Sequence, residues 1–132
     1  MEISTGENKD TDHRCSEWKG KFRCVSFHIV AMKVMSINIR GLGGSEKKSW
    51  IRELCAKEKI NLMGIQETKQ GKWCISQITN LWGVDDCDYI QSPATGNSGG
   101  LILVWDKKFF NCDFFIVEKS FVAAVGKWVG SP

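Results

Sequence analysis

Two polar residues stand at the ends of two short apolar segments, where their side chains could do chemistry. Asn38 comes at the end of the apolar segment 32–39, and Glu67 follows the apolar segment 62–65. A carboxylate such as Glu67 suits Mg²⁺, which takes one or two carboxylates and keeps several waters. An amide such as Asn38 can orient a second carboxylate, or donate to a phosphate oxygen without adding charge. The pair suits a metal-assisted phosphate site, although a strand-end Glu and a turn-forming Asn are each common elsewhere.

The stretch 32–69 must position these two residues, and it has the pattern strand, glycine turn, helix, strand. Side chains alternate onto one face in the first segment, and three glycines then permit a tight turn. Ser45 is the expected N-cap of the helix, whose apolar residues recur at helical spacing: Trp50, Ile51, Leu54 and Cys55. A helix between two strands returns the chain in the same direction, so we expect parallel strands. Asn38 and Glu67 would then emerge at the same edge of the sheet.

Three segments in this order resemble markers of a known family. They are Ser-Ile-Asn-Ile-Arg-Gly-Leu-Gly-Gly at 36–44, Ile-Gln-Glu-Thr-Lys at 65–69, and Asn-Ser-Gly-Gly-Leu-Ile-Leu-Val-Trp-Asp at 97–106. Together they resemble the endonuclease/exonuclease/phosphatase superfamily, and most closely the endonuclease domain of plant LINE-type (non-LTR) retrotransposons. The match covers about residues 32–130.

The resemblance implies roles for individual residues. Glu67 corresponds to the family's Mg²⁺-binding glutamate, and Asn38 to its first active-site asparagine. Arg40 and Lys69 lie near the same edge and are weaker candidates for contacts with phosphate or DNA, with an ordinary surface role as the alternative. The implied cofactor is Mg²⁺, the implied partner is DNA, and the implied location is intracellular, in the nucleus.

The same resemblance implies an α/β fold, the N-terminal half of the family's two-sheet α/β sandwich. The family's later motifs, a Tyr-containing strand, Gly-Asp-Phe-Asn and Ser-Asp-His, do not occur after Trp128. We therefore expect a truncated domain over 32–132, a fragment of a Mg²⁺-dependent phosphodiesterase that is inactive alone. The alternative is a non-catalytic module that binds nucleic acid or protein.

Further elements follow from local patterns. We expect a helix at 73–82 and strands at 88–92, 101–105, 114–117 and 121–125. The strand 101–105 is apolar on both faces, and the helices cover only one face. With no second sheet, the other face would stay bare and the chain would self-associate through it.

Composition adds limits on the class of protein. The net charge of +3 is too small to indicate nucleic-acid binding by itself, and six cysteines without a CxxC pair predict free thiols. Residues 1–31 are expected to be a disordered or loosely ordered leader, and no signal peptide or membrane-spanning segment is recognised. His13, Cys15, Cys24 and His28 lack the spacing of a structural zinc site, and Asp85, Asp86 and Asp88 suit a solvated turn.

Overall fold

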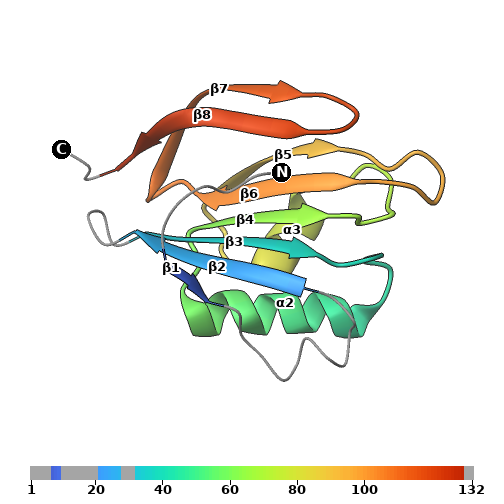
Figure 1. Ribbon diagram of the computed structural model, residues 1–132, viewed down its shortest axis with the longest axis horizontal. Coiled ribbons are helices and arrows are strands. Elements are labelled where there is room, and N and C mark those ends of the chain that lie inside the picture. Colours follow the sequence, from blue (N-terminus) through green and yellow to red (C-terminus); the bar gives the residue numbers. More distant parts are fainter. Residues whose placement is uncertain (1–6, 10–20, 28–31, 130–132) are drawn as a thin grey trace.

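The fold has three layers, shown edge-on in Figure 1: a two-stranded hairpin, a six-stranded sheet and two helices. The computed structural model describes residues 7–9, 21–27 and 32–129. The strands are β1 (Glu7–Lys9), β2 (Lys21–Phe27), β3 (Met32–Asn38), β4 (Leu62–Gln66), β5 (Cys87–Ser92), β6 (Leu101–Asp106), β7 (Phe110–Val117) and β8 (Val122–Trp128). The helices are α2 (Ser45–Glu58) and α3 (Ile75–Trp82). The chain is therefore a mixed α/β protein with two sheets, as expected for its class.

The large sheet is built around a β3–α2–β4 unit. The sheet order is β1-β2-β3-β4-β6-β5, and β3 and β4 pair in parallel while the other neighbours are antiparallel. Asn38 is the register partner of Gln66, the last residue of β4, so Glu67 lies just beyond the paired end of that strand. The helix N-cap is Gly44 rather than the expected Ser45, because Gly44 has extended φ and ψ and Ser45 is already helical. The predicted parallel pairing is confirmed.

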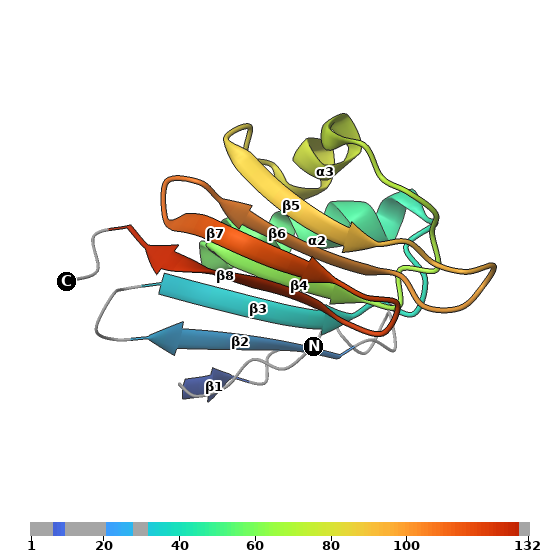
Figure 2. The same cartoon turned by 90° about the horizontal axis from the view of Figure 1, so that it is seen from above.

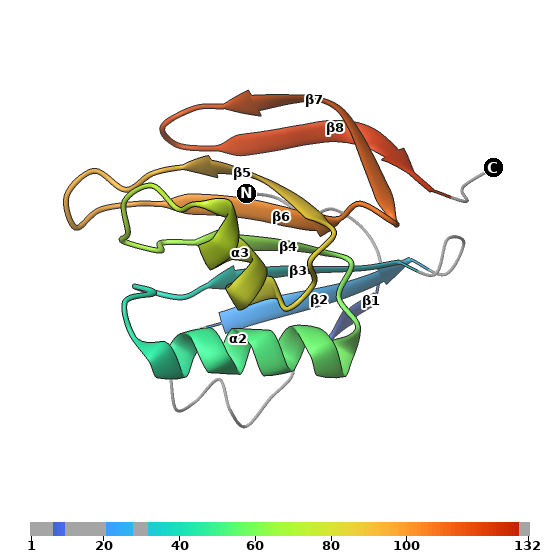
Figure 3. The ribbon, with the colours of Figure 1, turned by 180° about the vertical axis from the view of Figure 1, so that it is seen from behind.

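Both helices cover one face of the large sheet, as the reverse view in Figure 3 shows. The apolar residues of α2 and α3 interdigitate with alternate residues of β3, β4 and β6 in one core cluster. Met35, Ile37, Met63 and Ile65 are almost completely inaccessible to solvent in that cluster. Because burial of apolar area is the main favourable term in folding, this layer stabilises the β3–α2–β4 unit.

The opposite face of the large sheet is partly covered by the β7–β8 hairpin, which lies across it in Figure 2. Phe110 and Val122 of the hairpin pack with Leu103 and Trp105 of β6 and Ile90 of β5. The expectation that this chain has no second sheet, and so a bare face over β6, is therefore wrong. Residues 107–129 fold back and place apolar side chains on that face.

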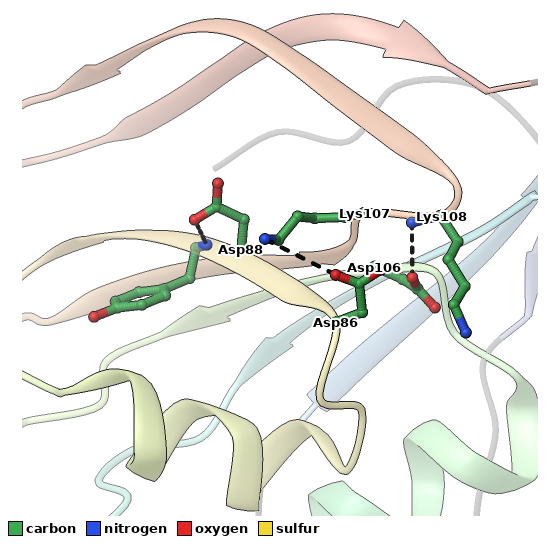
Figure 4. A network of polar contacts seen from close by, with 6 residues as sticks. Asp86, Asp88, Asp106, Lys107 and Lys108 are labelled. Carbon is green, nitrogen blue, oxygen red and sulfur yellow. Dashed lines mark hydrogen bonds and ion pairs between the residues drawn. The ribbon is translucent and has the colours of Figure 1, made fainter.

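The turn between β6 and β7 holds the hairpin in this position through a polar network (Figure 4). The buried Asp106 carboxylate accepts a hydrogen bond from the Lys108 backbone N–H at 2.9 Å, and the Asp106 carbonyl accepts from Phe109 N–H at 3.0 Å. Lys107 forms an ion pair with Asp86 at 3.9 Å, and its backbone N–H donates to the Asp86 carbonyl. The polar groups around this reversal thus have partners within the fold.

Two short stretches within the first 31 residues form strands. Residues 21–27 form β2, which pairs antiparallel with the whole of β3, and residues 7–9 form β1 on its outer edge. The physical reason is that β3 has an open edge whose backbone groups can pair with an antiparallel strand. The rest of this segment, and the side chains of the four possible zinc ligands, lie outside the described residues. No helix in the described part of the chain is long and apolar enough to cross a membrane.

Candidate functional site

The candidate site is the edge of the large sheet where β3 and β4 end, called the Asn38–Glu67 edge below. Backbone hydrogen bonds continue here past the paired strands: Ile39 N–H donates to Gln66 O, and Gly41 N–H donates to Glu67 O at 2.7 Å. Leu42 N–H donates to Thr68 O in the same way. Asn38 and Glu67 therefore lie at matching ends of adjacent parallel strands, as the sequence pattern predicts.

The backbone at this edge adopts a conformation that side chains disfavour. Arg40, Glu67 and Lys69 have φ of 51°, 55° and 55°, in the left-handed region. Among the described residues, the remaining non-glycine residue with positive φ is Lys59, which caps the C-terminus of α2. Left-handed non-glycine residues cost of order 1–3 kcal/mol and cluster at functional sites. Three of the four candidate residues share this feature.

The segment that carries Glu67 is held from its other side by the loop before β6. Thr68 N–H donates to Gly100 O at 3.2 Å, and Lys69 N–H donates to Gly99 O at 2.9 Å. Thr68 is buried, and a Cβ on Gly100 would collide with its hydroxyl group and approach Lys69 N at 3.1 Å. Gly100 also has φ +96°, so only glycine fits this contact without strain. The three segments that resemble the family's markers thus meet at one edge.

Asn38 has an unusual environment at this edge. Its neighbours Ile37 and Ile39 belong to the helix-side core, so the Asn38 side chain lies on the opposite face of β3. The Asn38 Oδ1 atom is buried and has no hydrogen-bond partner among the residues that the structure describes. A buried, unpaired amide oxygen costs roughly 1–3 kcal/mol relative to a paired one. This atom is an acceptor that the fold itself leaves unused.

The charged side chains at the edge also make no polar contact with the described part of the chain. In the part of the chain that the structure describes, the side chains of Arg40, Glu67 and Lys69 form no hydrogen bond or ion pair. Glu67 is half-buried, whereas Arg40 and Lys69 are exposed. One carboxylate and two cations are therefore available to a ligand that approaches this edge.

Lys47 is a residue of this edge that the sequence pattern does not single out. Its ammonium group donates to three successive backbone carbonyls, those of Ile39 (3.2 Å), Arg40 (3.4 Å) and Gly41 (2.9 Å). These contacts tie the turn after β3 to the first helical turn of α2. A depression of about 510 Å³ opens beside them, lined by Arg40, Lys47 and residues between.

The donor atoms at the edge fit a hydrated Mg²⁺ ion. Among the described residues, no three His, Cys, Asp or Glu side chains gather into a metal-binding group. Mg²⁺ does not need such a group, because it is bound through one or two carboxylates and keeps its remaining ligands as water. The half-buried Glu67 carboxylate is a hard oxygen donor of the kind this cation prefers, and Asn38 Oδ1 is a second hard oxygen, which is buried in this structure.

The comparisons with known proteins neither extend nor contradict these observations. No family model matches the chain, and no curated protein matches it significantly. The likeness to the endonuclease/exonuclease/phosphatase superfamily therefore stays a prediction from the three short segments.

Proposed function

We propose that the Asn38–Glu67 edge is the metal- and phosphate-binding part of a Mg²⁺-dependent phosphodiesterase site of the kind found in retrotransposon DNA endonucleases. The observation that carries the proposal is the buried Asn38 Oδ1, which has no partner among the described residues, at the strand end next to that of Glu67, whose backbone is strained and whose carboxylate makes no contact within the described residues. A fold that kept these residues only for stability would gain by pairing or replacing them. A ligand at this edge would recover that lost interaction energy.

Each residue then has a chemical role. Glu67 would hold the cation, which supplies positive charge to the phosphoryl oxygens and offsets charge that develops during hydrolysis. Asn38 would orient an oxygen ligand on its own face of the sheet, the face opposite to the helices. Arg40 and Lys69 would contact the phosphates of a DNA strand. Such contacts position the substrate but do not distinguish its base sequence.

We further propose that residues 1–132 bind at this edge without cleaving DNA. Hydrolysis also needs a group that activates water and a donor that holds the phosphate. Among the described residues there is no histidine, and the aspartates 85, 86, 88 and 106 lie at or beside the other end of β5 and β6. Catalytic groups that act together are strongly non-additive, so part of a site does not give a proportional part of the rate.

Metal binding is tested by thermal unfolding in increasing Mg²⁺. A ligand that binds only the folded state raises stability by RT ln(1 + [L]/Kd), so the melting temperature of the wild-type chain should rise with Mg²⁺. The Glu67→Gln variant should lose this rise, whereas Glu118→Gln, which removes an exposed carboxylate from the hairpin turn, should keep it. An equal rise in all three proteins would contradict the assignment of Glu67.

Assays with DNA distinguish DNA cleavage from DNA binding without cleavage. With Mg²⁺ and supercoiled DNA, we expect no nicking above that of Glu67→Gln. Robust nicking that is lost in Glu67→Gln would show that residues 1–132 hold a complete site, against the second proposal. Salt-dependent DNA binding that survives Glu67→Ala would instead favour a non-catalytic nucleic-acid-binding module, because Lys and Arg contacts with phosphate do not need the metal ligand.

A further inference from the structure

The turn that follows β3 carries three successive backbone carbonyls that need a hydrogen-bond donor. They belong to Ile39, Arg40 and Gly41, and no backbone N–H of the described residues donates to them. Backbone acceptors without a partner are costly where water cannot reach them, and Ile39 is completely buried. The turn therefore depends on a side chain from elsewhere in the fold.

Lys47 provides that side chain. Its ammonium group donates to all three carbonyls, at 3.2, 3.4 and 2.9 Å, and it forms no ion pair within the described part of the chain. The residue lies in the first turn of α2, where the helix dipole disfavours a cation. The contacts with the turn offset this unfavourable position of the charge.

The turn that Lys47 holds is bonded directly to the segment that carries Glu67. Gly41 N–H donates to Glu67 O at 2.7 Å, and Leu42 N–H donates to Thr68 O at 2.8 Å. Gly41 thus accepts a hydrogen bond from Lys47 through its carbonyl and donates one to Glu67 through its N–H. Two hydrogen bonds and one glycine connect the ammonium group to the backbone of the candidate metal ligand.

The backbone is strained on both sides of this connection. Arg40 and Glu67 have φ of 51° and 55°, and such conformations persist only where the surrounding structure over-determines them. The loop before β6 holds the Glu67 segment from one side, through its bonds to the N–H groups of Thr68 and Lys69. The bonds of Lys47 hold the turn on the other side.

We propose that Lys47 is a positioning residue of the Asn38–Glu67 edge: its ammonium group fixes residues 39–41, and through Gly41 it fixes the backbone that aims the Glu67 carboxylate at a cation. This role rests on the proposed function of that edge. It also predicts the sign of an effect. Coulomb's law alone predicts that removal of a positive charge near the edge strengthens Mg²⁺ binding, whereas loss of a positioning residue weakens it.

Two variants of neighbouring lysines separate these predictions. Lys47→Met keeps the apolar stem of the side chain but removes the ammonium group and its three bonds. Lys48→Met is the matched control, because Lys48 lies in the same helical turn and is also half-buried, but its ammonium group lies 5.4 Å from the centre of the Trp73 ring. Both variants remove one positive charge from the first turn of α2, and only the first loses the bonds to residues 39–41.

NMR spectra of the folded proteins measure both effects. A titration with Mg²⁺, followed through the Thr68 amide signal, should give a dissociation constant about tenfold higher in Lys47→Met than in the wild type, and an unchanged or lower one in Lys48→Met. Exchange of the Gly41 N–H with solvent deuterium, measured without Mg²⁺, should be at least about tenfold faster in Lys47→Met and unchanged in Lys48→Met.

The two measurements keep this proposal distinct from the proposed function. A wild-type chain that does not respond to Mg²⁺ would overturn the proposed function, and exchange of the Gly41 N–H would still decide whether Lys47 fixes the turn. Unchanged exchange in Lys47→Met would overturn the positioning role. An Mg²⁺ affinity in Lys47→Met that equals or exceeds that of the wild type would overturn it as well.

Discussion

The two ends of the large sheet use their polar residues in opposite ways. At the end near the β6–β7 turn, Asp106 and Lys107 find partners in the surrounding backbone and side chains. At the Asn38–Glu67 edge, one buried oxygen has no partner, and three side chains with backbone strain make no polar contact in the described chain. Since unpaired buried groups and strain both lower stability, the second end stabilises the fold less than the first end does.

Two asparagines make this contrast concrete. Asn61 precedes β4 at the first of these ends; its Oδ1 accepts from Lys33 N–H at 2.8 Å, and its carbonyl accepts from Asp106 N–H. Asn38 closes β3 at the other end with its Oδ1 unpaired. The same residue type therefore stabilises the fold at one end, whereas at the other its buried oxygen makes no hydrogen bond within the described residues.

The largest effect is expected from Gly100→Ala, which breaks the support of the Asn38–Glu67 edge. The new Cβ would collide with Thr68 and would occupy a left-handed conformation, so we expect a loss of about 3 kcal/mol or more. Chemical denaturation measures this loss. Gly96→Ala is the control, because Gly96 has positive φ but open space around it, and should lose only about 1 kcal/mol. Equal losses would show that the contact with Thr68 is unimportant.

The two asparagines provide a direct test of the comparison. Asn61→Leu leaves the Lys33 N–H unpaired and should lower the free energy of unfolding by about 2 kcal/mol. Asn38→Leu removes an oxygen that has no partner and should leave the free energy unchanged or raise it by about 1 kcal/mol. A loss in Asn38→Leu as large as that in Asn61→Leu would mean that both ends serve stability alike.

A smaller effect is expected from relief of backbone strain. Glu67→Gly and Lys59→Gly each place glycine at a left-handed position and should raise the free energy of unfolding by up to about 1 kcal/mol. Only Glu67→Gly should also abolish the Mg²⁺-dependent rise in melting temperature. If Glu67→Gly kept that rise, the strained carboxylate would not be the metal ligand.

The smallest expected effect concerns thiol reactivity at two ends of the fold. The Ser76 hydroxyl, 3.0 Å from the exposed Cys74 sulfur, lowers the pKa of that thiol, whereas burial raises the pKa of Cys87 beside Asp106. A lower pKa gives more thiolate at a fixed pH, so iodoacetamide should modify Cys74 before Cys87. Peptide mass spectrometry over pH 7–9 measures the rate of modification of each of the two cysteines. Faster reaction at Cys87 would show that this end opens readily.

Local patterns were enough to predict the β3–α2–β4 unit, since alternation, glycines and helical spacing all lie within one stretch of sequence. Parallel pairing then brought Asn38 and Glu67 to one edge. The pairing of residues 21–27 with β3 could not be predicted, because the polar composition around them gives no sign of a partner strand. The second sheet depends in the same way on long-range packing of Phe110 and Val122.

Features of the site that depend on backbone conformation were also beyond the sequence. Arg40, Glu67 and Lys69 adopt positive φ, although their residue types show no preference for it. The role of Gly100 depends on its contact with Thr68, 32 positions earlier in the chain. Such strain is imposed by surrounding hydrogen bonds and becomes visible only in the folded chain.

The three bonds of the Lys47 ammonium group have a consequence for covalent modification. An ammonium group has three N–H donors, whereas the amide of an acetylated lysine has one and carries no charge. Acetylation of Lys47 would therefore remove two of its bonds to the carbonyls of residues 39–41. A change of a few atoms at the end of one side chain would therefore loosen the turn that carries Arg40.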